Sequence, residues 1–193
     1  MKGTIRATLV SIAVAALATA CAQPGYTLTG PGRVTMADTY TIDTPVAWSR
    51  SARGRVEIWT VDGPQLQSVV FVNGAKDGDP LFEGEGADAR TAPRFHAAMT
   101  PIEIKELIEA SLRAAGARSL EAYDVRPQAW GSIQGFRFDY SYALENGLEK
   151  EGTAVAAVND GQLYAILYSG ARFHYYGKHK DDVERMIASI RMP

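Results

Sequence analysis

The 193-residue sequence has a single cysteine and three histidines. One cysteine excludes an intramolecular disulfide, so the fold must be held together by its hydrophobic core. A zinc site needs three or four ligands at recognisable spacing, and His96, His174 and His179 do not supply that pattern. We therefore predict no metal site and expect the histidines to lie in solvated loops or at strand ends.

The chain also lacks an excess of positive charge. The formal net charge is −2, and the lysines and arginines form no dense cluster of the kind that a nucleic-acid surface needs. The sequence also lacks the G-x-S-x-G motif, the EF-hand pattern and a glycine-rich phosphate loop. We predict no nucleic-acid partner, no cofactor and no catalytic residue. An exported hydrolase with an unrecognised active site, using His174 with a nearby acid, is the alternative.

The chain has no apolar run long enough to cross a membrane as a helix. Ala7–Ala20 carries no charge, but as a helix it would span only about 21 Å, against about 30 Å for a hydrocarbon core. Lys2 and Arg6 precede this run, and small residues follow it. A positive start, a short apolar run and small residues are typical of a secretory signal peptide, which we predict over residues 1–20.

The only cysteine follows this leader directly. The stretch Leu17–Cys21, "LATAC", resembles the lipobox of bacterial lipoproteins, although Ala18 stands where the family prefers Leu. The resemblance implies a diacylglycerol on the Cys21 sulfur, cleavage before Cys21 and acylation of the new amino terminus, so that the partner is a lipid bilayer. A plain signal peptide, leaving a free thiol, is the alternative. Ala22, rather than Asp, favours the outer membrane, with the protein facing the periplasm.

The rest of the chain is predicted to form a short tether and one domain that contains both strands and helices. Residues 21–33 are predicted to be the acylated cysteine and a short flexible tether, because they hold Pro and Gly without periodicity. Residues 34–193 are predicted to form a single α+β domain, an antiparallel β-sheet flanked by helices. The expected strands are 40–45, 55–61, 65–72, 135–144, 149–158 and 162–170, and the expected helices are 100–116, capped by Thr100 and Glu103, and about 180–190.

The order of these elements resembles the PsbP/Mog1-like superfamily. The segments that carry the resemblance are "YTIDTPVAW", "GFRFDYSYAL", "GQLYAILYSGARF" and "VERMIASI". The resemblance implies an accessory or binding protein rather than an enzyme, and no ligand residues of the superfamily map onto this chain.

Tyrosines are crowded in the C-terminal strands. Core packing beneath helices explains most of them, and the alternative is a partly open aromatic surface for a small ligand, peptide or glycan. For such a surface the candidate binding residues are Tyr142, Tyr164, Tyr168 and His174. The Gly- and Asp-rich segment 73–92 is predicted to be a solvated loop, with a binding lid or a calcium loop as alternatives.

We therefore expect a membrane-anchored lipoprotein of the cell envelope that acts as an accessory or binding protein. An exported hydrolase and a carrier of a small apolar ligand are the alternatives.

Overall fold

The computed structural model describes residues 25–82 and 88–192, and within them the fold is built on one antiparallel sheet of eight strands. A separate two-stranded hairpin and three helices complete the described part. In spatial order the large sheet contains β1 (Thr27–Thr29), β4 (Trp48–Arg53), β5 (Val56–Thr60), β6 (Gln67–Ala75), β10 (Gln162–Ala171), β9 (Glu149–Asn159), β8 (Ile133–Ala143) and β7 (Arg118–Trp130). The remaining elements are β2 (Gly32–Met36), β3 (Tyr40–Thr44), α1 (Asp88–Thr91), α2 (Pro101–Ala114) and α3 (Tyr175–Ala188).

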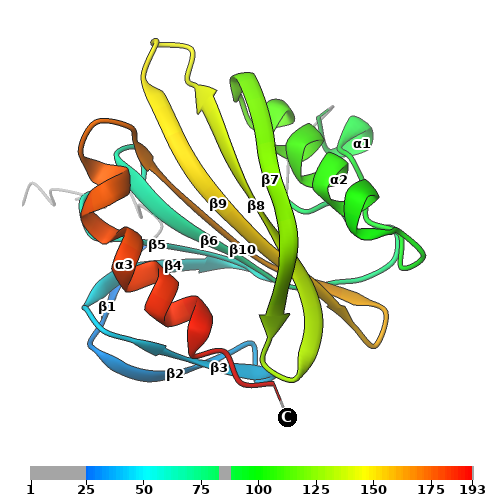
Figure 1. Ribbon diagram of the computed structural model, residues 1–193, viewed down its shortest axis with the longest axis horizontal. Helices are drawn as coiled ribbons and strands as arrows, with labels where there is room; N and C mark the ends of the chain where they lie inside the picture. Colours follow the sequence, from blue (N-terminus) through cyan, green and yellow to red (C-terminus); the bar gives the residue numbers. More distant parts are fainter. Residues whose placement is uncertain (1–24, 83–87, 193) are drawn as a thin grey trace, which may run out of the picture.

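The two faces of the sheet are covered by different elements (Figure 1). Helix α3 and the β2–β3 hairpin lie on one face, here called the α3 face, and α2 lies on the other, the α2 face. The hairpin is also joined to the end of the chain, because Thr41 and Arg191 exchange backbone hydrogen bonds of 2.9 Å. This arrangement confirms the predicted antiparallel sheet flanked by helices.

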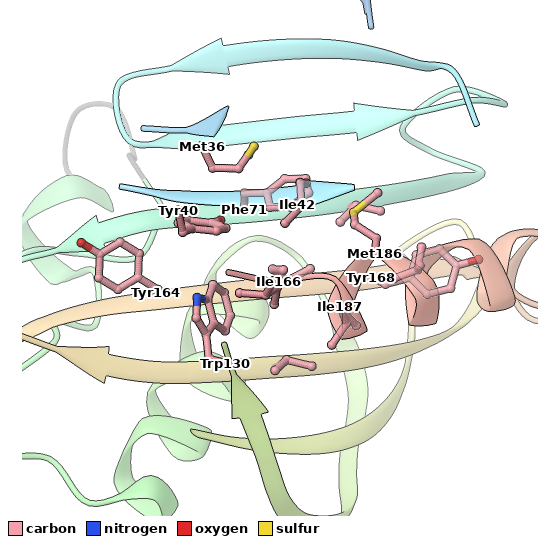
Figure 2. Close-up of a cluster of buried hydrophobic side chains, with 14 of the residues drawn as sticks. Met36, Tyr40, Ile42, Phe71, Trp130, Tyr164, Ile166, Tyr168, Met186 and Ile187 are labelled. Atoms are coloured by element: carbon pink, nitrogen blue, oxygen red, sulfur yellow. The ribbon is translucent and has the colours of Figure 1, made fainter. Parts of the chain in front are cut away.

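The α3 face is closed by a continuous aromatic and aliphatic core. Figure 2 shows side chains from the hairpin, the sheet and α3 meeting in this cluster. Three tryptophans of the cluster have no exposed surface. Its members include Met36, Tyr40, Ile42, Trp48, Trp59, Phe71, Trp130, Tyr164, Ile166, Tyr168, Met186 and Ile187.

The α2 face has a second core that covers less of the sheet. Helix α2 packs mainly against β7 and β8, with Ile104, Leu107 and Ile108 buried on its inner side. Over β4 and β5, in contrast, Val56 and Ile58 remain half-buried. This difference in cover leaves room for clefts on the α2 face.

Several local predictions are confirmed. Helix α2 begins after Thr100, whose side chain accepts a hydrogen bond from the Glu103 backbone while Glu103 caps the Thr100 backbone in return. β3 ends at Thr44, directly before Pro45. β5 and β6 pair as expected, and β8, β9 and β10 form the predicted antiparallel meander.

The longest strand, β7, has no counterpart among the predicted strands. Its pairing with β8 shifts register between Arg118 and Glu121 and again between Tyr123 and Arg126. Ser119 and Asp124 have positive φ at these shifts, so side chains beyond each bulge change faces and the alternation is lost from the sequence. Pro127 also argues against a strand in the sequence, because proline lacks a backbone donor. It is tolerated here because β7 is an edge strand.

Three other predictions need correction. Part of the expected tether is folded, because Thr27–Thr29 pairs with β4 and Gly32–Met36 pairs with β3. Helix α3 begins at Tyr175, before the expected start near residue 180, because the rings and glycine of "YYGK" have weak helix propensity and hide its first turn.

The described parts of segment 73–92, residues 73–82 and 88–92, are also more ordered than expected. Its first residues continue β6, and Leu81 is fully buried. Asp77 and Asp79 accept hydrogen bonds from the backbone N–H groups of Ala97 and Lys76, each of 2.9 Å. These carboxylates therefore shape the turn around them, whereas Glu83 and Glu85 lie outside the described residues.

The predicted signal peptide and Cys21 also lie outside the described residues. Within the described ranges, no helix has the length and apolar character that a membrane crossing requires.

Candidate functional site: a cleft around Lys150

The structure separates the four residues that were predicted to share an aromatic binding surface. Tyr164 and Tyr168 lie in the core of the α3 face (Figure 2). The Tyr168 hydroxyl donates to the backbone carbonyls of Tyr175, at 3.1 Å, and Tyr176, at 2.5 Å, and the Tyr164 ring packs edge-on against Tyr40, with centroids 5.9 Å apart. Both side chains are therefore structural. His174 is exposed at the start of α3 and contacts the Tyr175 ring.

His179 was predicted to lie in a solvated loop or at a strand end, and the structure shows that this prediction is wrong. It is buried in α3, with Nε2 2.9 Å from Asp62 and Nδ1 3.4 Å from Asp182, and its ring lies beside Trp48. Because both ring nitrogens face carboxylates, neither faces a hydroxyl that it might deprotonate. The arrangement ties α3 to the turn after β5 and does not resemble the base of a hydrolase.

Tyr142 differs from the other candidates, because it lies on the α2 face. Its position depends on Gly152, where a Cβ would lie 2.3 Å from the Tyr140 ring. The Tyr140 ring thus lies over this glycine and its hydroxyl donates to the Tyr168 carbonyl at 3.1 Å. The Tyr142 ring stacks on Tyr140, with centroids 6.0 Å apart, and its hydroxyl is 3.2 Å from Ser169 Oγ.

Lys150 lies directly opposite Tyr142 in the β8–β9 ladder. Only 4% of its surface is exposed, and its Nζ lies 6.0 Å from the centre of the Tyr142 ring. Within residues 25–82 and 88–192, no hydrogen bond or ion pair to another side chain is found for this amine. Burial lowers the pKa of Lys150 from 10.5 to about 8. A lysine that is buried along most of its length and has no carboxylate partner is uncommon, and such a residue is a candidate for a functional site.

The amine lines a cleft of about 680 Å³. The walls come from the end of α2, the start of β7, the β8–β9 turn and the turn before β6. Arg118 adds a second cation, and Glu145, an exposed residue of the β8–β9 turn, adds the one acidic side chain of the lining. Burial raises the pKa of the Tyr142 phenol, so its hydroxyl stays protonated. The lining residues are Pro64, Gln65, Ser68, Ala115, Gly116, Arg118, Tyr142, Leu144, Glu145, Asn146 and Lys150.

This arrangement is suited to binding an anion. A protonated Lys150, Arg118, the Ser68 hydroxyl and the Tyr142 ring and hydroxyl are all accessible to one ligand in the same cleft. A carboxylate or phosphate would supply the countercharge that the described residues do not supply to Lys150. Neither Ser68 nor Ser169 is hydrogen-bonded to the amine, so these two serines do not form a Ser–Lys pair ready for nucleophilic attack.

The sequence contained one signal for this site. In Glu149–Asn159 the residues Lys150, Gly152, Ala154 and Ala156 alternate onto one face, so a lysine shares a face with small apolar residues. The tertiary structure alone determines that Lys150 pairs with Tyr142 and that α2 leaves part of the sheet uncovered beside them. No group of three or more His, Cys, Asp or Glu side chains suited to a metal ion occurs in the described part of the chain.

Comparisons with known proteins identify the fold. No family model and no curated protein sequence matches the chain. The cyanobacterial PsbP (CyanoP) of Synechocystis sp. PCC 6803 is 12% identical, with a TM-score of 0.53 over 90% of this chain and 96% of that chain. LpqN, a Mycobacterium tuberculosis protein involved in cell envelope biogenesis, is 15% identical, with a TM-score of 0.48 over 87% and 92%.

The Ran-binding protein Mog1p of Saccharomyces cerevisiae is 8% identical, with a TM-score of 0.47 over 88% of this chain and 96% of that chain. At these identities a likeness bears on architecture and carries no activity across. Together with the strand order described above, the likeness to CyanoP shows that the chain has the PsbP/Mog1-like α+β fold.

Proposed function

We propose that this protein is a non-catalytic binding lipoprotein of the cell envelope that recognises an anionic ligand in the Lys150 cleft. The observation that carries the proposal is the mostly buried Lys150 side chain, which lines a cleft of about 680 Å³ and has no carboxylate partner among the described residues. An accessory role fits a site that offers charge, hydroxyls and an aromatic ring but no activated nucleophile.

The envelope location is supported by the sequence. Lys2 and Arg6, the apolar run to Ala20 and the lipobox-like "LATAC" together describe an exported chain that is acylated at Cys21. Two or more acyl chains hold a protein stably on a bilayer, whereas a single chain holds it marginally. With Ala22 after the cysteine, we propose the outer membrane as the site of anchoring, with the folded domain facing the periplasm.

The binding proposal is tested by the titration of Lys150, followed by NMR of its ε-carbon in the folded protein. Without an anion the amine should titrate near pH 8. Inorganic phosphate or acetate should raise this pKa, since an anion nearby favours the charged form. Because binding needs the ammonium, the affinity for acetate, whose own charge is constant here, should fall about tenfold from pH 7 to pH 9. Burial raises the pKa of the Tyr142 phenol, so Tyr142 stays protonated in this window.

Two variants make the test specific. Lys150→Met should abolish the anion effect, while Lys76→Met, which removes an exposed lysine that does not line the cleft, should leave it intact. A Lys150 that titrates near 10.5, or whose titration is unchanged by either anion, would contradict the proposal.

The anchor is tested separately. Cys21→Ser should abolish labelling by palmitate and leave the precursor uncut, and the wild-type protein should fractionate with the outer membrane. Recovery of a mature protein with a free thiol would contradict the proposed anchoring and would leave the anion-binding proposal unaffected.

A further inference from the structure

A second, mainly apolar space lies beside the Lys150 cleft on the same face of the sheet. This groove has a volume of about 400 Å³ and shares Ala115, at the end of α2, with the Lys150 cleft. Apart from Ser51 and Arg53, its lining is formed by apolar and aromatic side chains together with Ala115. They are Tyr26, Val56, Ile58, Val70, Phe82 and Leu112.

The groove exists because α2 does not extend over this part of the sheet. The helix packs mainly on β7 and β8, whereas the groove has β4, β5 and β6 as its floor. Val56, Ile58 and Val70 are half-buried there, while their counterparts on the α3 face, such as Trp59 and Val69, are fully buried. Apolar surface left uncovered in this way is typical of a binding groove.

The two spaces are also neighbours along the floor of the sheet. Ser68 lines the Lys150 cleft, and Val70, two residues further along β6 and on the same face, lines the groove. Taken together, one end carries Lys150 and Arg118, and the other end is mainly apolar, with the exposed Arg53 as its one charged residue. This polarity matches a molecule with a negative head and a hydrocarbon tail.

We propose that the cleft and the groove form one site for a single-chain amphiphile, with its carboxylate or phosphate head at Lys150 and its acyl chain between β4–β6 and the end of α2. The proposal rests on the proposed function, which it deepens by naming the ligand class. From Lys150 on β9 to Ile58 on β5 the sheet extends three strand spacings across and four residues along, or roughly 20 Å in all. An acyl chain spans about half of a hydrocarbon core, or roughly 15 Å, so a long chain whose head group lies at Lys150 reaches into the groove.

The test compares butanoate, dodecanoate and dodecyl phosphate, each below its micellar concentration, by titration calorimetry at pH 7. Each buried methylene strengthens binding by about a factor of three to four, so burial of about half of the eight additional methylenes should make dodecanoate bind roughly a hundredfold more tightly than butanoate. Saturable binding of dodecanoate or of dodecyl phosphate supports the proposal, and the tighter of the two identifies the head group.

Ala115→Trp should separate the two halves of the site. The residue is exposed at the junction, so a large ring there blocks the passage for the chain but leaves Lys150 in place. This variant should lose the gain in affinity from butanoate to dodecanoate, a ratio that is measured within the variant itself. Ala114→Trp is the matched control, because Ala114 is also exposed but lines neither space, and it should behave as wild type.

Failure of this inference differs from failure of the proposed function. If butanoate binds in a Lys150-dependent manner but longer chains bind no more tightly, or if Ala115→Trp leaves the chain-length dependence unchanged, the groove is not a site for the chain and the proposed function stands. If Lys150→Met binds dodecanoate as tightly as wild type, the head-group site and the proposed function are both overturned.

Discussion

The two faces of the sheet use similar residues for different purposes. On the α3 face, the hydroxyls of Tyr40 and Tyr168 are hydrogen-bonded inside the core, to Asn73 Oδ1 at 2.9 Å and to the backbone of α3. On the α2 face, Tyr142 and Lys150 line an open cleft, and among the described residues the Lys150 amine has no hydrogen-bonded or ionic partner. Complete cover therefore makes polar side chains structural, and incomplete cover leaves them available to a ligand.

The largest expected effect compares the same substitution on both faces. Ile166 is fully buried on the α3 face, whereas Ile58 is half-buried in the groove. Ile166→Ala should lower the free energy of unfolding by about 3–4 kcal/mol, because it leaves a cavity in a closed core. Ile58→Ala should cost about 1 kcal/mol, because the half-buried side chain contributes less buried apolar surface that the truncation can remove. Urea denaturation measures both, and equal losses would contradict the difference in cover.

A second comparison uses glycines. A Cβ at Gly152 would lie 2.3 Å from the Tyr140 ring, so Gly152→Ala must displace the ring that supports Tyr142. We expect a loss of about 1–3 kcal/mol from overpacking, together with weaker anion binding in the Lys150 cleft.

The control for this variant is Gly177→Ala in α3. No atom lies within 4 Å of a Cβ at Gly177, so this change should be neutral or raise stability by up to about 1 kcal/mol. Thermal unfolding distinguishes the two variants, and a Gly152→Ala protein as stable as wild type would mean that Tyr140 and Tyr142 adapt without strain.

Lys150→Met tests whether the lysine is retained at a cost to stability. Burial lowers the pKa of Lys150 to about 8 in the folded protein, so between about pH 8 and 10.5 the unfolded chain binds more protons and wild-type stability rises with pH. The variant should therefore be more stable than wild type by about 1–2 kcal/mol at pH 7, and the difference should shrink as the pH rises through this window. Denaturant curves from pH 7 to 10 check this, and a constant difference would refute it.

The smallest expected effect compares two hydroxyl deletions. Tyr168→Phe removes the donor to the α3 backbone and should cost about 1–2 kcal/mol, because it leaves a buried carbonyl with one partner fewer. Tyr142→Phe removes a hydroxyl at the edge of a hydrated cleft and should cost about 0.5 kcal/mol or less. A larger loss for Tyr142→Phe, measured by urea denaturation, would place Tyr142 in the structural core instead of the ligand site.

Local signals were enough to predict most of the regular elements. The alternation in Ile133–Ala143, the turn signals between β8, β9 and β10, and the capping box at Thr100 were each read correctly. β7 was missed because two bulges break its alternation. The burial of His179 was missed because it depends on Asp62, which is far away in the sequence.

Only part of the proposed binding site could be predicted from the sequence. Tyr142 was among the candidates, but Tyr164 and Tyr168 were grouped with it because neighbouring strands look alike in a pattern of alternation. The face that each tyrosine occupies, and the position of Lys150 opposite Tyr142, follow from strand register.

The sequence by itself determined the α+β class, the position of most strands and the best-capped helix, because these depend on periodicity, propensity and short motifs, and it also predicts a leader over residues 1–20. Only the tertiary structure decided which polar groups are left without partners. That outcome depends on how far α2 reaches across the sheet, and therefore on packing between segments that are distant in the chain.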